Sequence, residues 1–319
     1  MRHLKFTFVA LAATLFISCS NEEEVQSSYP SDNVVRIQTD INGTKTRASY
    51  TSGTLQEFGF SIMNNNNATY SYDNMKVEKV SGSWKPASQM LWQNATQPVD
   101  IIAYAPYNAN VSGSLHNQTA YELAVGTDQT LADDHSDFLV YRKTGFVPQN
   151  DLVNSAVPVS FSHALSQLNI NITFGSEYNT TALLTANPIS RMEVDGTIIQ
   201  GTCDFSTGTD VVASTNASTY TQTVKAAPTG EFTAATDKKD NAQTSYTCIL
   251  IPQTISAGKF SVTIFINGKA YTWTSTDAVT LEKGTSHQLD LQVGKNTVIM
   301  GSFSSQPWAD GSETTLPTD

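Results

Sequence analysis

Short stretches in which apolar and polar residues alternate recur along the whole chain, most cleanly over residues 34–41 (VVRIQTDI). The two alternating sets are Val35, Ile37, Thr39, Ile41 and Val34, Arg36, Gln38, Asp40. A period of two is that of a β-strand with one buried face. We therefore predict a strand over 34–41 with Val35, Ile37 and Ile41 buried, because a one-residue slip would bury the charged set instead.

Similar strand-like runs continue to the end of the chain. They cover residues 58–63, 75–80, 99–104, 138–142, 157–161, 168–174, 192–194, 197–199, 246–251, 260–266, 270–274, 278–281, 287–293 and 297–303. Turn residues separate them. Asn267-Gly268 predicts a two-residue hairpin, because both central positions of such a turn need positive φ. Asp195-Gly196 and Ser81-Gly82 are weaker signals of the same kind.

Many short strands at even spacing are typical of antiparallel sandwiches, so we predict an all-β chain with less than about a tenth of its residues in helices. A length of 319 residues leaves room for two domains. The polar, turn-rich segment 144–155 places the boundary between domains at 33–153 and 154–319. Residues 211–241, rich in Thr, Ala, Ser and Lys, are expected to form a long surface excursion.

The first eighteen residues have the pattern of an export signal. A basic start precedes an apolar run over residues 6–17, which is too short to span a bilayer, and a small residue follows at Ser18. The next residue is Cys19, and the stretch 15–19 resembles a bacterial lipobox, although Phe16 stands where leucine is usual. This resemblance implies that Cys19 carries lipid; the alternative is an ordinary signal peptide followed by an incidental cysteine.

The segment 19–32 is expected to be an acidic surface linker. Its run Glu22-Glu23-Glu24 resembles the surface-export tag of some Gram-negative lipoproteins, or is a solvated linker. The net charge of the chain is −11, and no basic cluster is present. Such a charge argues against nucleic acid as a partner and against electrostatic membrane binding, which leaves the lipid as the expected membrane contact.

The sequence contains no recognisable catalytic motif, and we expect neither an enzyme nor a cofactor. The best metal candidate is the set Asp133, His135 and Asp137, whose alternation would place all three on one side; an acidic turn is the simpler interpretation, and we expect no metal. His163 is a conceivable general base, or a histidine bonded near the edge of the core. Cys203 and Cys248 either form a disulfide or are small buried residues.

Several stretches together resemble the fimbrillin family, the lipoprotein pilins of type V pili. They are, in chain order, 44–48 (TKTRA), 99–107 (VDIIAYAPY), 137–141 (DFLVY), 159–172 (VSFSHALSQLNINI), 249–254 (ILIPQT) and 306–311 (QPWADG). The resemblance covers nearly the whole chain apart from 211–241. It implies two tandem transthyretin-like β-sandwich domains and a structural role at the outer membrane and then in the fimbria. It also implies that an arginine-specific protease cuts after the first strand.

Residue chemistry makes this mechanism plausible at particular positions. Cleavage between Arg47 and Ala48 would fall in a polar loop after the strand, where a protease can reach it; Arg47 could equally be an ordinary loop arginine. Loss of the strand would leave an unpaired edge and an apolar slot for a strand from another subunit. A donor candidate lies at 297–303. Its alternation places Ile299 and Phe303 on one side, with Val298 and Met300 on the other.

The sequence therefore predicts a pilus subunit that is cut at Arg47 and polymerises with other subunits by donor-strand exchange, in support of adhesion. Alternatives are an anchor or tip subunit of the same family, or a surface glycan-binding lipoprotein. The glycan-binding alternative requires two or more Trp or Tyr rings lying coplanar on one surface.

Overall fold

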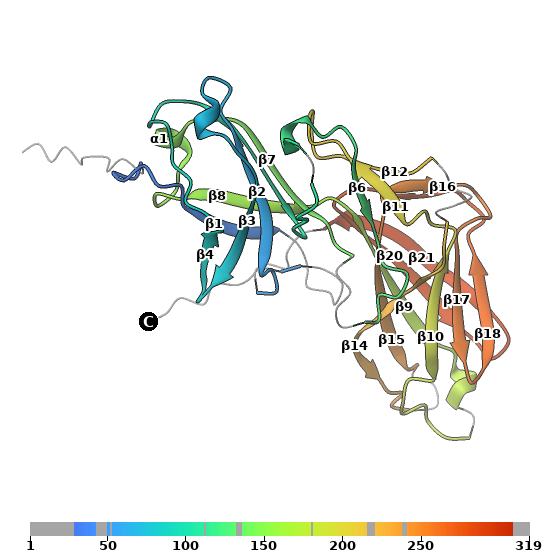
Figure 1. The fold of residues 1–319 in the computed structure, drawn as a ribbon. Helices are drawn as coiled ribbons and strands as arrows, with labels where there is room; N and C mark the ends of the chain where they lie inside the picture. The colour runs from blue at the N-terminus through green and yellow to red at the C-terminus, as the bar shows by residue number, and fades with distance from the viewer. Residues whose placement is uncertain are drawn as a thin grey trace, which may run out of the picture.

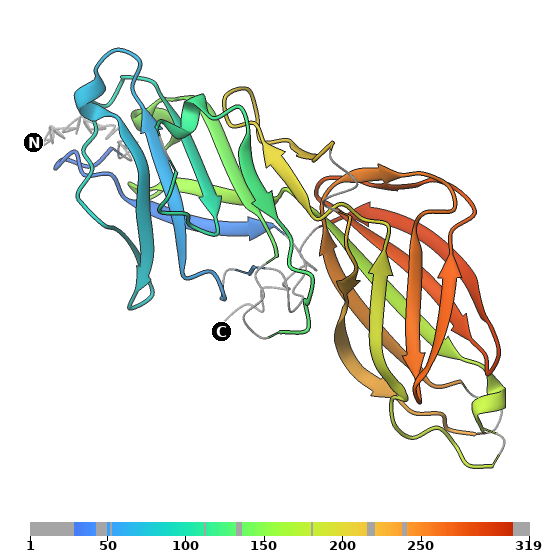
Figure 2. The same ribbon diagram turned by 45° about the vertical axis from the view of Figure 1, so that its right-hand side comes forward.

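A computed structural model describes residues 29–42, 50–51, 53–111, 113–131, 136–179, 181–215, 221–237 and 241–308. These residues are almost entirely β, as predicted, and form two lobes joined end to end (Figure 1 and Figure 2). The helices are single turns: η1 (Ala68–Tyr70), η2 (Leu115–Asn117), α1 (Pro148–Asp151) and η3 (Ser176–Asn179). In the part of the chain described, no helix has the length and apolar character to cross a membrane.

The N-terminal lobe is built on one seven-stranded sheet with the order β1-β8-β7-β5-β2-β3-β4. Its strands are β1 (Ile37–Asn42), β2 (Glu57–Met63), β3 (Tyr72–Val80), β4 (Ser83–Pro86), β5 (Val99–Ala105), β7 (Leu139–Phe146) and β8 (Val157–His163). The sheet curls, so that its two edge strands, β1 and β4, approach each other. All neighbours in it are antiparallel except β1 and β8, which run parallel.

The C-terminal lobe is a sandwich of a five-stranded sheet, β14-β15-β9-β20-β21, and a four-stranded sheet, β13-β10-β17-β18. Their strands are β9 (Ser166–Phe174), β10 (Ile189–Asp195), β13 (Val224–Lys225), β14 (Ala227–Thr233), β15 (Gln243–Leu250), β17 (Ser261–Ile266), β18 (Lys269–Thr274), β20 (Thr285–Val293) and β21 (Val298–Pro307). Two smaller sheets complete the fold: β6 (Tyr121–Ala124), β11 (Gln200–Cys203) and β12 (Val211–Ala213), and the pair β16 (Gln253–Ile255) and β19 (Val279–Leu281).

Turn residues formed two of the three predicted hairpins. Asn267 and Gly268 have φ of 51° and 79° and join β17 to β18. Ser81 and Gly82, with φ of 51° and 81°, join β3 to β4 in the same way. Gly196 also has positive φ, but the strands on either side of it, β10 and β11, belong to different sheets. A Cβ there would lie 2.1 Å from the carbonyl oxygen of Lys259, so close backbone approach requires glycine at this position.

Strand β5 is buried on both faces and separates the two cores. Ile101, Ala103 and Ala105 belong to the core of the N-terminal lobe. Ile102 and Tyr104 point the other way, into a core that continues between the sheets of the C-terminal lobe. This double burial explains why β5 reads as a continuous apolar run rather than as an alternating one. It also attaches the two lobes through a shared apolar layer.

Two sequence-based expectations about organisation were wrong. The boundary at 153/154 falls before β8, yet β8 belongs to the seven-stranded sheet, and the chain passes to the C-terminal lobe only between His163 and Ser166. The segment 211–241 is not a long surface excursion, because β12, β13 and β14 lie within it and five of its described side chains are buried: Val211, Val224, Ala226, Ala227 and Ala235. Polar composition hid these strands, since edge strands bury few side chains.

A buried histidine in β20 predicts a loss of stability in mild acid. The Nε2 atom of His287 accepts the backbone N–H of Glu282 at 3.1 Å, and burial lowers the pKa of His287. As the pH falls below about 6.5, the unfolded chain therefore binds the proton first, and the free energy of unfolding decreases. We expect the thermal midpoint to fall between about pH 7 and pH 5, above the range in which carboxylates titrate.

His287→Gln keeps a hydrogen-bond acceptor that does not titrate, so its midpoint should fall less over the same range. Burial also lowers the pKa of His116, so part of the dependence should remain. An equally steep fall in both proteins would assign the whole effect to other groups.

Candidate functional site

The first strand lies at one edge of the seven-stranded sheet, with β8 as its neighbour. The register joins Ile37 to Val157 and Ile41 to Phe161 in parallel. The strand begins at Ile37 rather than at Val34, because residues just upstream bond to a different segment. Val35 donates its backbone N–H to the carbonyl of Met90 at 2.9 Å.

The side chains of this segment are buried as the alternation predicted. Val35 and Ile41 are 2% exposed and Ile37 is 8% exposed, whereas Arg36 and Asp40 are exposed. The buried three belong to the core of the N-terminal lobe, over residues of β8 that are themselves fully buried. The first strand is thus an integral part of this core, although it has a strand partner on one side only.

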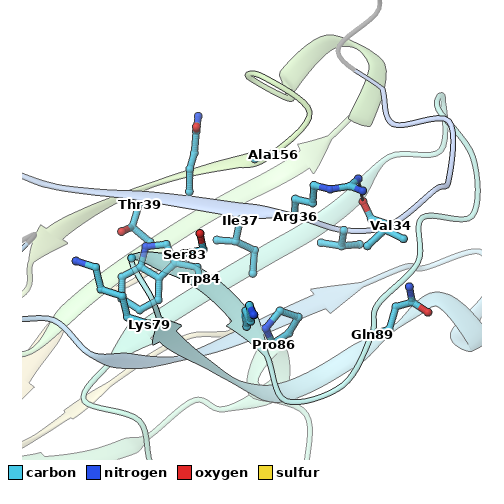
Figure 3. Close-up of a pocket in the computed structure, with 14 residues that line it drawn as sticks. Val34, Arg36, Ile37, Thr39, Lys79, Ser83, Trp84, Pro86, Gln89 and Ala156 are labelled. Carbon is cyan, nitrogen blue, oxygen red and sulfur yellow. Dashed lines mark hydrogen bonds between the residues drawn. The ribbon is translucent and has the colours of Figure 1, made fainter.

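A groove of about 900 Å³ separates the free edge of β1 from β4 at the opposite edge of the sheet (Figure 3). Val34 to Thr39 line one wall, and Gly82 to Pro86 line the other. Because each edge strand has a sheet neighbour on one side only, the groove is bounded by two strand edges that could pair with added chain.

Aromatic packing shapes the wall on the β4 side. The Trp84 ring packs edge-on against Phe58, with 4.9 Å between ring centroids, and Phe58 contacts Phe161 under β1 at 5.3 Å. The ammonium of Lys79 lies 5.6 Å from the centre of the Trp84 ring. The groove is therefore apolar at its base and lined at its rim by basic side chains.

The rim also carries an exposed ion pair between Arg36 and Asp32, at 2.6 Å. The hydrogen bonds from the Arg36 side chain lower the pKa of Asp32 to about 2. Both side chains are half exposed, so the pair contributes little to stability. It holds Arg36 away from the core, as the alternation requires.

The donor candidate, residues 297–303, covers the N-terminal part of β21. This strand is the edge strand of the five-stranded sheet and pairs with β20. Its predicted faces were wrong, because a bulge near Gly301 shifts the register after Met300. Phe303 lies beside Leu289 and Met300 beside Leu291, so these two residues share the face that carries Val298. Ile299 alone points the other way. Ile299, Met300 and Phe303 are 52%, 48% and 36% exposed.

The predicted metal set and histidine are only partly covered by the structure. Asp133 and His135 lie outside the described residues, but Asp137 is buried and its carboxylate contacts Nδ1 of His163 at 2.8 Å. One face of the His163 ring is stacked on Trp308, with 3.9 Å between ring centroids. His163 is therefore bonded within the core rather than placed as a base. Over the ranges described, no three His, Cys, Asp or Glu side chains are grouped to hold a metal.

Sequence reasoning missed the cluster of Asp137, His163 and Trp308. The signal was present, because each residue lies in one of the stretches that carry the family resemblance. Cys203 and Cys248, by contrast, are free and buried in the core, and burial raises the pKa of both thiols, that of Cys203 to about 12.

The lipidation and cleavage positions Cys19, Arg47 and Ala48 lie outside the described residues.

The parallel ring pairs found among the described side chains are Trp92–Phe146, Tyr121–Phe138, His163–Trp308 and His287–Phe303. Each has at least one ring in the core, so none forms the exposed platform that glycan binding would need.

Comparison with known proteins identifies the fold and the family. A candidate cell adhesion protein from Bacteroides ovatus superposes with a TM-score of 0.62 at 16% identity, over 86% of this chain and 97% of its own. One from Bacteroides uniformis gives 0.58 at 15%, over 88% and 100%. A fimbrial protein from Bacteroides vulgatus gives 0.50 at 16%, over 86% and 99%.

No curated protein matches the chain significantly. The family model described as fimbrillin-like matches residues 46–308. This match covers most of the chain and includes strands of both lobes. The chain therefore belongs to the fimbrillin-like family.

Proposed function

We propose that this protein is a structural subunit of a cell-surface pilus and polymerises by donor-strand exchange in support of adhesion. The observation that carries the proposal is the position of β1. Together with Val35 just before it, β1 fills the core through Ile37 and Ile41, yet it lies at a sheet edge beside an open groove. An edge strand can leave without breaking any other strand pairing, which a central strand cannot do.

Departure of β1 together with Val35 just before it would expose both backbone and apolar surface. The free edge of β8 would offer unpaired N–H and C=O groups, and the core would lose three apolar side chains. Burying such side chains is worth about 1.5–3 kcal/mol each, so a replacement strand gains several kcal/mol. The vacated site would also join the existing groove, which gives an incoming strand a place to enter beside β1.

Strand β21 supports the role of donor. It is an edge strand, and three of its apolar side chains, Ile299, Met300 and Phe303, are exposed to a degree unusual for such residues. A second copy or another subunit could bury them in the vacated slot. In the monomer β21 is paired with β20 over its length, so donation requires its release.

Lipidation and cleavage, the remaining steps of the proposal, rest on the sequence. Cys19 would carry the lipid that holds the subunit at the outer membrane, surface-exposed, before its entry into the fimbria. An arginine-specific protease would cut between Arg47 and Ala48 and leave β1 attached by noncovalent contacts alone. A cleavable arginine and a donor strand together favour a shaft subunit over an anchor or a tip.

A crosslink between β1 and β8 tests whether β1 must leave. Asp40 and Ser160 are in register on the exposed face, so Asp40→Cys with Ser160→Cys should form a disulfide without disturbing the core. We expect the oxidised, protease-treated double variant to remain monomeric in size-exclusion chromatography and electron microscopy. Reduction of the same sample should restore polymerisation, which supplies the matched control. Fibres from the oxidised form would show that β1 stays in place during assembly.

A further inference from the structure

Burial is uneven along β21 and the residue that follows it. The ten residues of the strand, from Val298 to Pro307, are all exposed or half exposed. The next residue, Trp308, is 5% exposed and is therefore the one buried side chain between 298 and 308. Apart from the backbone ladder to β20, the strand is held chiefly at this end.

Trp308 is seated at the junction of the two lobes. Its indole is stacked on the imidazole of His163, with 3.9 Å between ring centroids and 6° between the ring planes. Its backbone N–H donates to the carbonyl of Gly284 at 2.8 Å, and the N–H of Gly284 donates to Leu165 at 2.9 Å. These two hydrogen bonds connect the end of β21, through Gly284, to the segment between β8 and β9.

The ring under the indole is itself fixed. Asp137 contacts His163 Nδ1 through both carboxylate oxygens, at 2.8 and 3.0 Å, and both side chains are fully buried. The same carboxylate accepts the backbone N–H of Tyr50 at 3.0 Å. Tyr50 lies three residues after Arg47 in the sequence. One carboxylate therefore holds both the chain that follows the predicted cut and the ring that receives Trp308.

We infer that Trp308 and His163 form a latch that keeps β21 on its own sheet, and that separation of the two rings is the step that frees the strand. Because Trp308 supplies the buried side chain of this segment, its release leaves β21 held by the ladder to β20, by the partly buried Val298 and by two contacts on an exposed edge, the stack of Phe303 on His287 and the hydrogen bond from Ser302 to Asp290. Such ladders open locally with little cost. The consequence for assembly, though not the latch itself, rests on the proposed function.

Hydrogen exchange of the purified, uncleaved chain tests the latch without any assembly step. In Trp308→Ala we expect the amides of β21 to exchange roughly tenfold faster or more, while those of β17 in the opposite sheet keep their rates. Trp308→Phe keeps a ring on His163 and should restore most of the protection. Ile299→Ala removes an exposed side chain from the same strand and should leave exchange unchanged.

Unchanged exchange of β21 in a folded Trp308→Ala protein would overturn the latch. If β17 also loses protection, the protein has unfolded more widely, and Trp308→Leu, which retains apolar burial without the stacked ring, is compared in its place under the same criterion. Polymerisation after cleavage is then measured separately. Faster fibre growth in the loosened variant supports the control of assembly, and equal growth contradicts it. Absence of fibres from the parent itself counts against the proposed function and leaves the exchange result standing.

Discussion

Replacing Arg47 by alanine is expected to give a folded monomer that does not polymerise. If cleavage occurs after Arg47, the variant keeps β1 covalently linked to the rest of the chain. An incoming strand must then compete with a tethered one, whose effective concentration is far higher. Because the buried residues of β1 are untouched, the thermal midpoint should equal that of the parent. Fibre yield in electron microscopy after protease treatment should fall essentially to zero.

Two matched variants separate cleavage from charge. Arg47→Lys keeps the positive charge but should resist an arginine-specific protease, so it should behave like Arg47→Ala. Lys45→Ala removes a neighbouring charge in the same stretch and should assemble as the parent does. Normal fibres from Arg47→Ala would exclude this residue as the trigger. A mature N-terminus at Ala48, read by mass spectrometry, would establish the cut directly.

Replacing Phe58 by alanine is expected to cause the largest loss of stability in the N-terminal lobe. The ring is fully buried and packs edge-on against both Trp84 and Phe161, so it joins the wall of the groove to the core under β1. Truncating a buried phenylalanine costs about 3–5 kcal/mol, a large share of the roughly 5–15 kcal/mol that a folded domain possesses. Urea unfolding monitored by fluorescence should show this loss.

Phe303→Ala is the matched control, because the same chemical change is made at a ring that is 36% exposed on an edge strand. Its cost to the monomer should be below about 1 kcal/mol. If β21 is the donor, this variant should nevertheless assemble poorly. A loss of stability as large as that of Phe58→Ala would mean that Phe303 is more deeply packed than the structure shows. Normal assembly would argue against β21 as the donor.

Alternation along the chain was sufficient to predict local structure where one face is buried. In residues 34–41 it predicted the strand and its buried side, because side chains of period two can satisfy a core on one face only. The pair Asn267-Gly268 predicted its hairpin for a similarly local reason, since few residues adopt positive φ at both positions. Such signals depend on neighbours within a few residues.

Partners that lie far apart in sequence were beyond such reasoning. The buried face of β1 would be the same beside any neighbour, so nothing local indicates that β8, more than a hundred residues away, pairs with it in parallel. The bulge near Gly301 changed which side chains share a face, because it depends on how β21 meets β20. Within the polar segment 211–241, strands β12, β13 and β14 likewise formed only because neighbouring sheets supply their hydrogen bonds.

The candidate site shows the same division. Its apolar residues Val35, Ile37 and Ile41 were determined by the sequence, since hydrophobic side chains must leave water wherever the strand packs. Its edge position and the groove beside it are properties of a curled sheet, and only the tertiary structure decided them. The contact of Trp308 with His163 depends on two lobes meeting end to end, because their side chains come from segments that no local pattern brings together.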